Sequence, residues 1–501
     1  MARTSRPNPG GPGDVGQPRF ILGPVLYFRG EQGDRWRLSA LFVIDGNAEP
    51  DDLRVDGVGL PVPPRHVAAW RRRTLWRFDF AVPRGAHDSE VTYGFPDGPG
   101  PWRLTVPGRG RPPRIAYTSC NGVEDDATLT RHDAPRNALW TRLLDHHRQA
   151  PFHLLLQGGD QLYADGVWKE CPTLAEWAKR PAPARYSEPL KAAMAEEAMA
   201  YYFTRYVKLW RQAEVAEALS RIPSVMMWDD HDVFDGWGSL PDEEMHAKPN
   251  RAVYMVARRH FTLFQLGAAP ESLPECVWGT DRGTFTQGFR IGDLGILAPD
   301  LRSERTAGRI LAERTWDALP GWLERFTGCR HLLLMSSVPL VFPDLGRIER
   351  LMEMLPGRHA LSDDMRDQWR SHAHTVEWRR MVELLSGFSL RTGCRVTVLS
   401  GEVHFAARGV LRGGGAEIWQ LISSGIVHPP PGRLTGMGME RLLARREAPI
   451  DGYTLEMPPF AETGRRMVRA RNWLSLEFDA RGQLAARWHA ESNPAAYVQM
   501  I

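Results

Sequence analysis

The sequence predicts an α/β protein in which a small antiparallel β-sandwich precedes a larger domain of alternating strands and helices. Three observations support this prediction. Short apolar stretches separated by turn clusters fill residues 20–109, strand-like runs alternate with helical patterns from Arg114 onward, and four of those runs end abruptly in polar residues. The chain has 501 residues. This exceeds one typical hydrophobic core, so two domains or one elaborated domain are expected.

The first part of the chain is expected to be a flexible tail followed by the sandwich. Residues 1–18 are polar and rich in Pro and Gly, which is typical of a disordered segment. Residues 19–110 carry several short, partly alternating apolar stretches, the pattern of a small antiparallel sandwich. The segment 107–113 is rich in Pro, Gly and Arg and predicts a linker. The boundary of the first domain is therefore placed at residue 110.

Residues 111–501 are expected to form the second domain. About residues 174–220 the sequence is rich in Ala, Glu and Arg at helical spacing, which predicts a helical insertion that covers the sheet edge. Near the end of the chain, two apolar stretches surround Gly482 and predict a hairpin over residues 474–488.

Four apolar runs in this chain end in residues that bind metals. A short run without alternation is typical of a strand buried on both faces. Residues just past the carboxyl end of such a strand lie at the sheet edge, where open α/β folds place their sites. The runs and their polar ends occupy residues 115–121, 153–163, 224–232 and 396–404. Because the ends contain Cys, Asp, Tyr, His and Glu, they predict one metal site at a shared edge.

Each of these endings also has an explanation without a metal. Asp160 follows two glycines and would cap a helix, and Tyr163 would pack in the core. Cys120 alone is more often a small buried residue than a ligand. The acidic stretch at residues 229–232 would be a solvated loop, although its carboxylates are costly to bury without a cation. Glu402 and His404, spaced at i and i+2, would face the same side of an extended strand.

Taken together, the four endings resemble a known family. Their order and spacing are similar to those of the PhoD-like alkaline phosphatases, a branch of the calcineurin-like metallophosphatase superfamily, over roughly residues 20–430. The resemblance implies an αββα sandwich of two mixed sheets flanked by helices, behind the N-terminal β-sandwich. It also implies metal-dependent hydrolysis of phosphate esters, in which a hydroxide between two metals attacks and His231 is the general acid.

The resemblance further implies a role for each residue. The first metal, expected to be Fe³⁺, would be held by a thiolate, a phenolate, a bridging carboxylate and an imidazole, those of Cys120, Tyr163, Asp160 and His404. The second site would use Asp230 and Glu402, and its oxygen ligands suit Ca²⁺, Mn²⁺ or Mg²⁺. Asp232 would orient His231. Arg302, in the Asp-x-Arg segment at residues 300–302, would contact phosphate; a surface ion pair is the other interpretation of this arginine.

Composition and charge limit the other functions that this chain can have. The formal charge of +3 argues against nucleic-acid binding beyond a possible phosphodiester substrate. Five scattered cysteines do not form a disulfide framework, and no signal peptide or transmembrane run is visible. We therefore expect a cytoplasmic protein without a membrane anchor that acts on a small-molecule phosphate ester, either a monoester or a diester. Two other functions stay open: a catalytically silent scaffold or binding protein of the same fold, and an arginine-rich nucleic-acid-binding protein.

Overall fold

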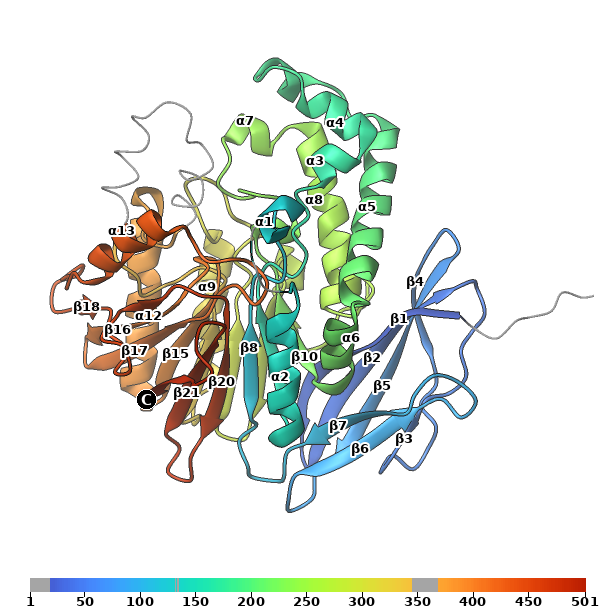
Figure 1. The fold of residues 1–501 in the computed structure, drawn as a ribbon, viewed down its shortest axis with the longest axis horizontal. Helices are drawn as coiled ribbons and strands as arrows, with labels where there is room; N and C mark the ends of the chain where they lie inside the picture. Colours follow the sequence, from blue (N-terminus) through green and yellow to red (C-terminus); the bar gives the residue numbers. More distant parts are fainter. Residues whose placement is uncertain (1–18, 131, 133–134, 345–367) are drawn as a thin grey trace, which may run out of the picture.

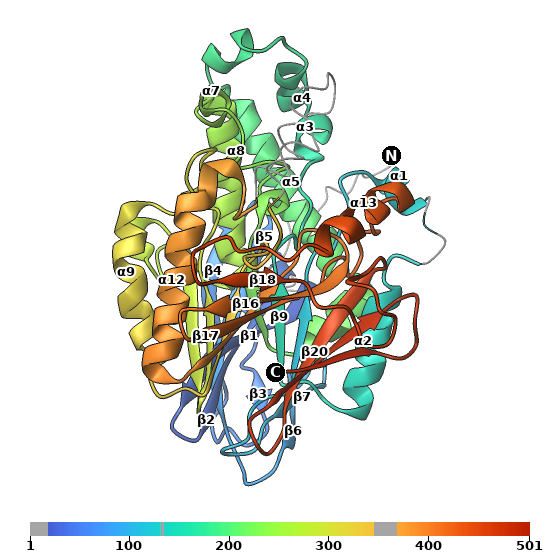
Figure 2. The ribbon, with the colours of Figure 1, turned by 90° about the vertical axis from the view of Figure 1, so that its left-hand side faces the viewer.

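Two large mixed β-sheets pack face to face and helices cover their outer faces (Figures 1 and 2). The computed structural model describes residues 19–130, 132, 135–344 and 368–501. The predicted flexible tail at residues 1–18 lies outside the described residues.

The first sheet has the order β22-β21-β20-β8-β9-β10-β1-β2-β5-β4. At its centre run three parallel strands that are buried at every residue, β8 (Ile115–Thr118), β9 (Leu154–Gly158) and β10 (Ser224–Met227). Their continuous apolar sequence suits this position, because both faces are covered. The strands on either side are mainly antiparallel: β1 (Arg19–Gln32), β2 (Arg35–Asp45), β4 (Arg65–Trp70), β5 (Arg73–Pro83), β20 (Asn472–Phe478), β21 (Leu484–Ala490) and β22 (Tyr497–Met500).

The second sheet has the order β11-β12-β13-β14-β15-β17-β16-β18, with β19 also paired to β16. Its parallel centre is β13 (Leu294–Ala298), β14 (His331–Met335), β15 (Arg395–Ser400) and β17 (Ala416–Ile422). The other strands are β11 (Val277–Trp278), β12 (Thr286–Ile291), β16 (Ala406–Gly413), β18 (Thr454–Glu456) and β19 (Met467–Val468). The two sheets meet through apolar side chains, and the rings of Phe28 and Phe289 lie 5.3 Å apart between centroids.

Helices cover the outer face of each sheet. Figure 2 shows α9 (Glu313–Glu324) and α12 (Thr375–Thr392) on one side of the paired sheets and α2 (Ala138–Gln149) on the other. Helix α6 (Ala213–Arg221) packs beside α2 and against β1. The predicted αββα arrangement of two mixed sheets is therefore confirmed.

A small third sheet gives the N-terminal region its two layers. It consists of β3 (Arg54–Val55), β6 (Ser89–Gly94) and β7 (Trp102–Val106). The ring of Phe42 lies 5.2 Å from that of Phe95 and 5.6 Å from that of Trp102, so this sheet packs on the N-terminal strands of the first sheet. Since β1 also pairs with β10, the first sheet continues across the predicted boundary at residue 110.

Helices occupy the region of the predicted insertion and rise beyond the sheets at the top of Figure 1. They are α3 (Val167–Glu170), α4 (Pro172–Ala178), η1 (Ala184–Ser187) and α5 (Ala192–Trp210). Helix α5 packs against α8 (Lys248–His260) and the π-turn η3 (Phe261–Gln265), where the rings of Tyr206 and Phe264 stack at 4.5 Å.

The remaining described helices are short or peripheral: α1 (Asp126–Thr130), η2 (Asp230–Asp232), α7 (Asp242–Met245), η4 (Thr280–Arg282), η5 (His372–His374) and α13 (Arg433–Leu443). Across the described ranges, none of the helices is both long enough and apolar enough to cross a bilayer.

Candidate metal centre

The four predicted strand ends come together at one edge of the sheets. Strands β8, β9 and β10 are parallel neighbours, so their carboxyl ends lie side by side. The backbone N–H of Cys120 donates to the carbonyl of Gly159 at 3.2 Å, which joins the ends of β8 and β9. From the second sheet, the N–H of Ile426 donates to the carbonyl of Ser119 at 3.0 Å. The edge predicted from sequence is thus assembled from both sheets.

The backbone is strained at five of the predicted ligands. Cys120, Asp160, Tyr163, Glu402 and His404 have φ values of 53°, 57°, 51°, 63° and 57°. Among the described residues other than glycine, one more, at position 71, has a positive φ. The left-handed region is uncommon for such residues and costs of order 1–3 kcal/mol each, so it persists where the surrounding structure imposes it. The strained backbone at these positions therefore destabilises the fold somewhat and fixes the direction of the five side chains.

A buried trio forms the first cluster. Cys120, Asp160 and Tyr163 are each exposed by 1% or less. The Cys120 Sγ and the Tyr163 hydroxyl both donate to Asp160 Oδ2, at 3.4 and 3.5 Å. In the described part of the chain, Asp160 Oδ1 is buried and has no hydrogen-bond partner. Burial raises the pKa of the Asp160 carboxyl well above its usual range, and Cys120 and Asp229 raise it further.

The geometry of this trio fits one metal ion. Metal–oxygen and metal–sulfur bonds of about 2.0–2.3 Å place neighbouring ligand atoms roughly 3–3.5 Å apart. The separations from Asp160 Oδ2 to Cys120 Sγ and to the Tyr163 hydroxyl, 3.4 and 3.5 Å, match this spacing. Burial also raises the pKa of the Cys120 thiol and of the Tyr163 phenol, so a cation is needed to keep these groups as anions.

An imidazole completes this side of the site. The Oγ of Ser424 lies 3.1 Å from Cys120 Sγ and 3.4 Å from His404 Nδ1, and so connects the two predicted ligands. The ring of His404 stacks on that of His428 at 3.5 Å. Burial holds the pKa of His404 well below its usual value, which leaves the neutral imidazole that metals bind.

His428 and Glu124 also belong to the site, although the sequence did not assign them as ligands. Ligand atoms of Glu124, His404 and His428 lie within 4.8 Å of one another. His428 Nε2 is 3.2 Å from Glu124 Oε1. Burial alone would raise the pKa of Glu124, but His428 and His231 outweigh it and hold this pKa well below the usual range. Glu124 is therefore a carboxylate at the mouth of the site.

Three aspartates form a second cluster. Ligand atoms of Asp160, Asp229 and Asp230 lie within 4.8 Å of one another, and all three residues are buried. Gly159 makes the approach possible, because a Cβ at its φ of 108° would meet Asp229 Cβ at 2.8 Å. Asp229 stands directly after β10 and caps the turn η2 by accepting from the backbone N–H of Asp232. The sequence analysis predicted Asp230 as a ligand and did not predict Asp229. The position of Asp229 directly after Trp228, at the end of the apolar run, could have indicated it.

Arg302 lies in the interior and contacts two aspartates of the second cluster. Its side chain is 0% exposed. The guanidinium contacts Asp229 Oδ1 through Nε and Nη2, lies 3.5 Å from Asp230 Oδ1, and donates to the carbonyl of Trp237 at 3.1 Å. Since these contacts use all three nitrogens in the interior, Arg302 holds the two aspartates in place. The alternative interpretation, a surface ion pair, is wrong because the side chain is buried; the expected phosphate contact stays a prediction.

The expected orientation of His231 by Asp232 is wrong. The Asp232 carboxylate accepts the backbone N–H groups of Asp160, Gln161 and Asp229 and the side-chain amide of Gln265, each at 2.9 Å. Its role is to fix the turns that carry Asp160 and Asp229, because a buried carboxylate needs such donors. Burial raises the pKa of Asp232 to about 7.

Asp165 orients His231 instead. Its Oδ2 lies 3.0 Å from His231 Nδ1, and its Oδ1 accepts the backbone N–H of Asp235 at 2.7 Å. The imidazole stacks on the ring of Tyr163 at 4.5 Å, and its Nε2 lies 3.9 Å from Glu124. Burial alone would lower the pKa of His231, but Asp165 and Asp230 outweigh it and raise this pKa well above its usual value. Asp165 thus favours the charged form of the ring.

Glu402 does not share a strand face with His404. Strand β15 ends at Ser400, and residues 401–405 form bends with left-handed backbone at both Glu402 and His404. The i, i+2 argument fails because it requires extended backbone. The Glu402 carboxylate accepts from the side-chain amide of Gln368 at 3.1 Å. Three groups of metal-ligating side chains are found among the described residues, and Glu402 belongs to none of them. They are Glu124 with His404 and His428, Asp230 with His231 and Asp235, and Asp160 with Asp229 and Asp230.

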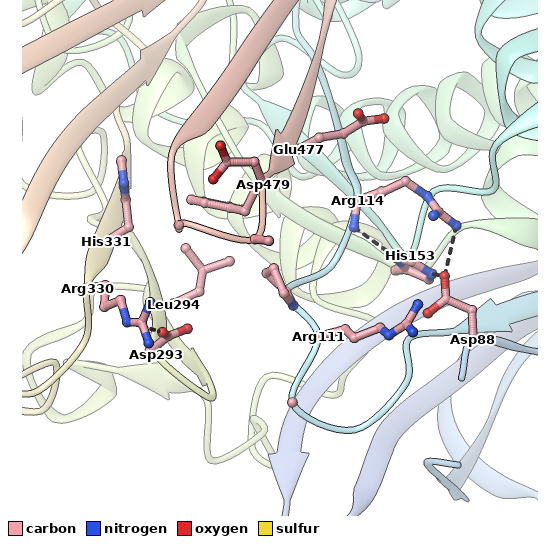
Figure 3. Close-up of a pocket in the computed structure, with 15 residues that line it drawn as sticks. Asp88, Arg111, Arg114, His153, Asp293, Leu294, Arg330, His331, Glu477 and Asp479 are labelled. Atoms are coloured by element: carbon pink, nitrogen blue, oxygen red, sulfur yellow. Dashed lines mark hydrogen bonds and ion pairs between the residues drawn. The ribbon is translucent and has the colours of Figure 1, made fainter. Parts of the chain in front are cut away.

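A separate pocket lies at the opposite edge of the sheets (Figure 3). It has a volume of about 580 Å³ and lies beside the first residues of β13 and β14. Its charged groups largely neutralise one another: Arg114 pairs with Asp88 at 3.1 Å and Arg330 with Asp293 at 2.8 Å. None of the predicted ligands lines it.

Comparisons with known proteins identify the family and the fold of this chain. A family of PhoD related phosphatases matches residues 127–360 and 355–445, which is more than half of the chain. An uncharacterized protein of Saccharomyces cerevisiae is 25% identical over 427 residues, covering 73% of this chain. The chain spans 60% of the length of that yeast protein.

Two solved structures share the fold. The structure of PhoD superposes with a TM-score of 0.56 at 14% identity, over 98% of this chain and 90% of its own. The purple acid phosphatase PPD1 from seeds of yellow lupin (Lupinus luteus) superposes with a TM-score of 0.53 at 11% identity, over 95% of this chain and 72% of its own. The family match and these folds lead to one conclusion: the chain belongs to the PhoD related phosphatases.

Proposed function

We propose that this chain hydrolyses phosphate esters with two metal ions that share Asp160. The observation that supports this most strongly is the position of that carboxylate. Its Oδ2 is shared by Cys120 and Tyr163, while the residue also clusters with Asp229 and Asp230. A carboxylate common to two ligand groups is the arrangement that brings two cations close together.

The first ion would be Fe³⁺, held by Cys120, Asp160, Tyr163 and His404. A thiolate and a phenolate bring two negative charges into a buried site, which a trivalent cation compensates better than a divalent one. His404 supplies a neutral nitrogen, as its lowered pKa indicates. The nearby His428 would hold the His404 ring by stacking on it.

The second ion would be Ca²⁺, Mn²⁺ or Mg²⁺, held by Asp160, Asp229 and Asp230. All of these ligands are carboxylates, and oxygen ligands favour these hard cations over zinc. Arg302 already balances part of the negative charge of Asp229 and Asp230. The second cation would balance the remainder, which explains why so many carboxylates are buried at one place.

Each residue near the two ions would have its own role in hydrolysis. When bound, the two ions would polarise the phosphate and lower the pKa of the attacking water. His231 would protonate the leaving alkoxide from Nε2, a step typically worth 10²–10⁴-fold in rate. Asp165 would keep the imidazolium charged and aimed, because it holds Nδ1 at 3.0 Å. Asp232 and Arg302 would keep the ligand carboxylates in register through their buried contacts.

The test is turnover of phosphate esters by Asp160→Ala. We expect the variant to lose hydrolysis of both monoesters and diesters, because both ion sites lose a ligand. The matched control is Asp293→Ala, which removes a half-exposed aspartate at the opposite edge of the sheets and should leave turnover unchanged. Turnover by Asp160→Ala at the wild-type rate would contradict the proposal. A folded, metal-loaded wild type that cleaves none of the esters would favour the silent scaffold.

A further inference from the structure

Helix α13 exposes two long apolar side chains among arginines. Leu434 is 85% exposed and Met437 is 58% exposed, and their spacing of three residues puts them on one face of the helix. Seven arginines lie on the helix and on the two segments that follow it: Arg433, Arg441, Arg445, Arg446, Arg465, Arg466 and Arg469. We call these nine residues the α13 face.

The arginines of the α13 face carry uncompensated charge. In the described ranges, none of the seven forms an ion pair with a carboxylate, and two nearby glutamates pair with arginines outside the face. Glu447 pairs with Arg370 at 2.5 Å, and Glu456 pairs with Arg412. Glu440 accepts two backbone N–H groups, at 2.8 and 3.2 Å. The α13 face is therefore a local positive surface on a chain whose formal charge is only +3.

The surface is also hollowed between the arginines. A depression of about 590 Å³ is lined by the side chains of four of them together with Met437 and Glu440; the four are Arg433, Arg441, Arg465 and Arg469. A hollow with arginines around its rim suits a phosphate-bearing headgroup, because guanidinium groups bind phosphate in a fork. It has no aromatic lining residue, so it offers no platform for stacking bases.

Helix α13 packs on the same buried cluster as the loop that carries His404. Helix α13 is fixed to the body of the protein by Leu442 and Leu443, which are buried in a cluster with Phe405. Val403, which stands between Glu402 and His404, packs against the same cluster.

We propose that the α13 face binds the surface of a membrane that contains anionic phospholipids. Apolar side chains that project between basic residues are the signature of a segment that lies in the membrane interface. Each arginine near an anionic surface contributes roughly fivefold in affinity, and Leu434 and Met437 add the burial of their side chains among the lipid acyl chains. This is peripheral binding and requires no spanning helix. It does not depend on the proposed hydrolysis.

The test is co-sedimentation of the full chain with vesicles. Wild type is expected to bind vesicles of phosphatidylcholine with phosphatidylserine and to leave pure phosphatidylcholine vesicles in the supernatant. Neutralising the four arginines that line the hollow, as R433Q, R441Q, R465Q and R469Q together, should weaken binding several-hundredfold at roughly fivefold each. The double change Leu434→Gln and Met437→Gln keeps the arginines and adds no charge, and it should weaken binding by roughly tenfold or more.

The chain contains a matched control. The turn between β4 and β5 and the end of α5 carry Arg71, Arg72, Lys208 and Arg211 around another hollow, and Figure 1 shows β4 and α13 at opposite sides of the molecule. R71Q, R72Q, K208Q and R211Q together remove the same charge. This control should bind vesicles within about twofold of wild type, since its four altered basic side chains lie away from the α13 face. Both quadruple variants should hydrolyse a soluble ester as wild type does.

Three results would overturn the proposal. The first is equal binding to vesicles with and without phosphatidylserine, including no binding to either. The second is an equal loss in the two quadruple variants. The third is binding to duplex DNA that needs the four arginines but not Leu434 and Met437, which would assign the α13 face to a polyanion instead of a membrane.

Discussion

Replacing Arg302 by Met separates a structural role from a substrate contact. The guanidinium is 0% exposed and faces Asp229, which is 1% exposed. Removing one partner of a buried ion pair typically costs about 3–5 kcal/mol, because the other charge stays buried without compensation. For a chain of 501 residues the entropy of unfolding is about 1 kcal/mol/K, so the metal-free variant should unfold roughly 3–5 °C lower.

The assay is thermal unfolding of the metal-free protein, followed by kinetics of the loaded enzyme. Arg148→Met is the control, because Arg148 is half exposed and pairs with Asp145 and Glu217 at the surface. Water and salt screen such a surface pair, so Arg148→Met should unfold within about 1 °C of wild type. If Arg302→Met unfolds at the wild-type temperature and raises only KM, Arg302 contacts substrate and the positioning role is wrong.

Two further predictions concern protons. Asp165→Asn should lower kcat by up to the 10²–10⁴-fold that a general acid supplies, with little change in KM, because His231 loses its partner at Nδ1. The limb of the pH–rate profile that reports the general acid should also shift. An unchanged pH–rate profile would exclude this orienting role. His147, His153 and His260 are buried, and burial lowers the pKa of each to about 4. In the unfolded chain these histidines titrate near 6.5, so the unfolded state binds more protons than the folded state between pH 6.5 and 4. The free energy of unfolding should therefore decrease as the pH is lowered through this range, by up to about 1.4 kcal/mol per pH unit for each histidine. Denaturant titrations across this range measure the slope, and a flat response would contradict it.

The cluster of Cys120, Asp160 and Tyr163 was predictable from sequence because strand ends converge. Cys120, Asp160 and Tyr163 follow buried parallel strands, and parallel neighbours bring their carboxyl ends to one edge whatever the loops do. The fold class followed from the same runs. What the sequence could not give was the direction of side chains within a turn.

The cluster of Asp160, Asp229 and Asp230 shows this limit. Asp229, Asp230 and Asp232 are nearly adjacent in sequence, yet the turn η2 sends the first two toward Asp160 and uses the third as a buried acceptor of N–H groups. Similarly, Glu402 was placed by strand periodicity, but the strand had already ended at Ser400. Local spacing predicts direction only where the backbone is regular.

Contacts between residues that are distant in sequence could not be predicted either. Arg302 meets Asp229 across 73 positions, and Asp165 meets His231 across 66. Nothing in the local pattern of either residue names its partner, since such contacts arise when the sheet brings separate loops together. Charge gave a hint, because a cluster of buried carboxylates needs a buried cation.

Metal content combined with visible absorption tests the central claim most directly. The account predicts two ions per chain, one of them iron, and a visible band from charge transfer between the Tyr163 phenolate and Fe³⁺. Tyr163→Phe should abolish the band, and Asp160→Ala should lose ions from both sites. A protein that hydrolyses phosphate esters with one ion per chain or with none, or that shows the same band after Tyr163→Phe, would contradict the two-ion site built around Asp160.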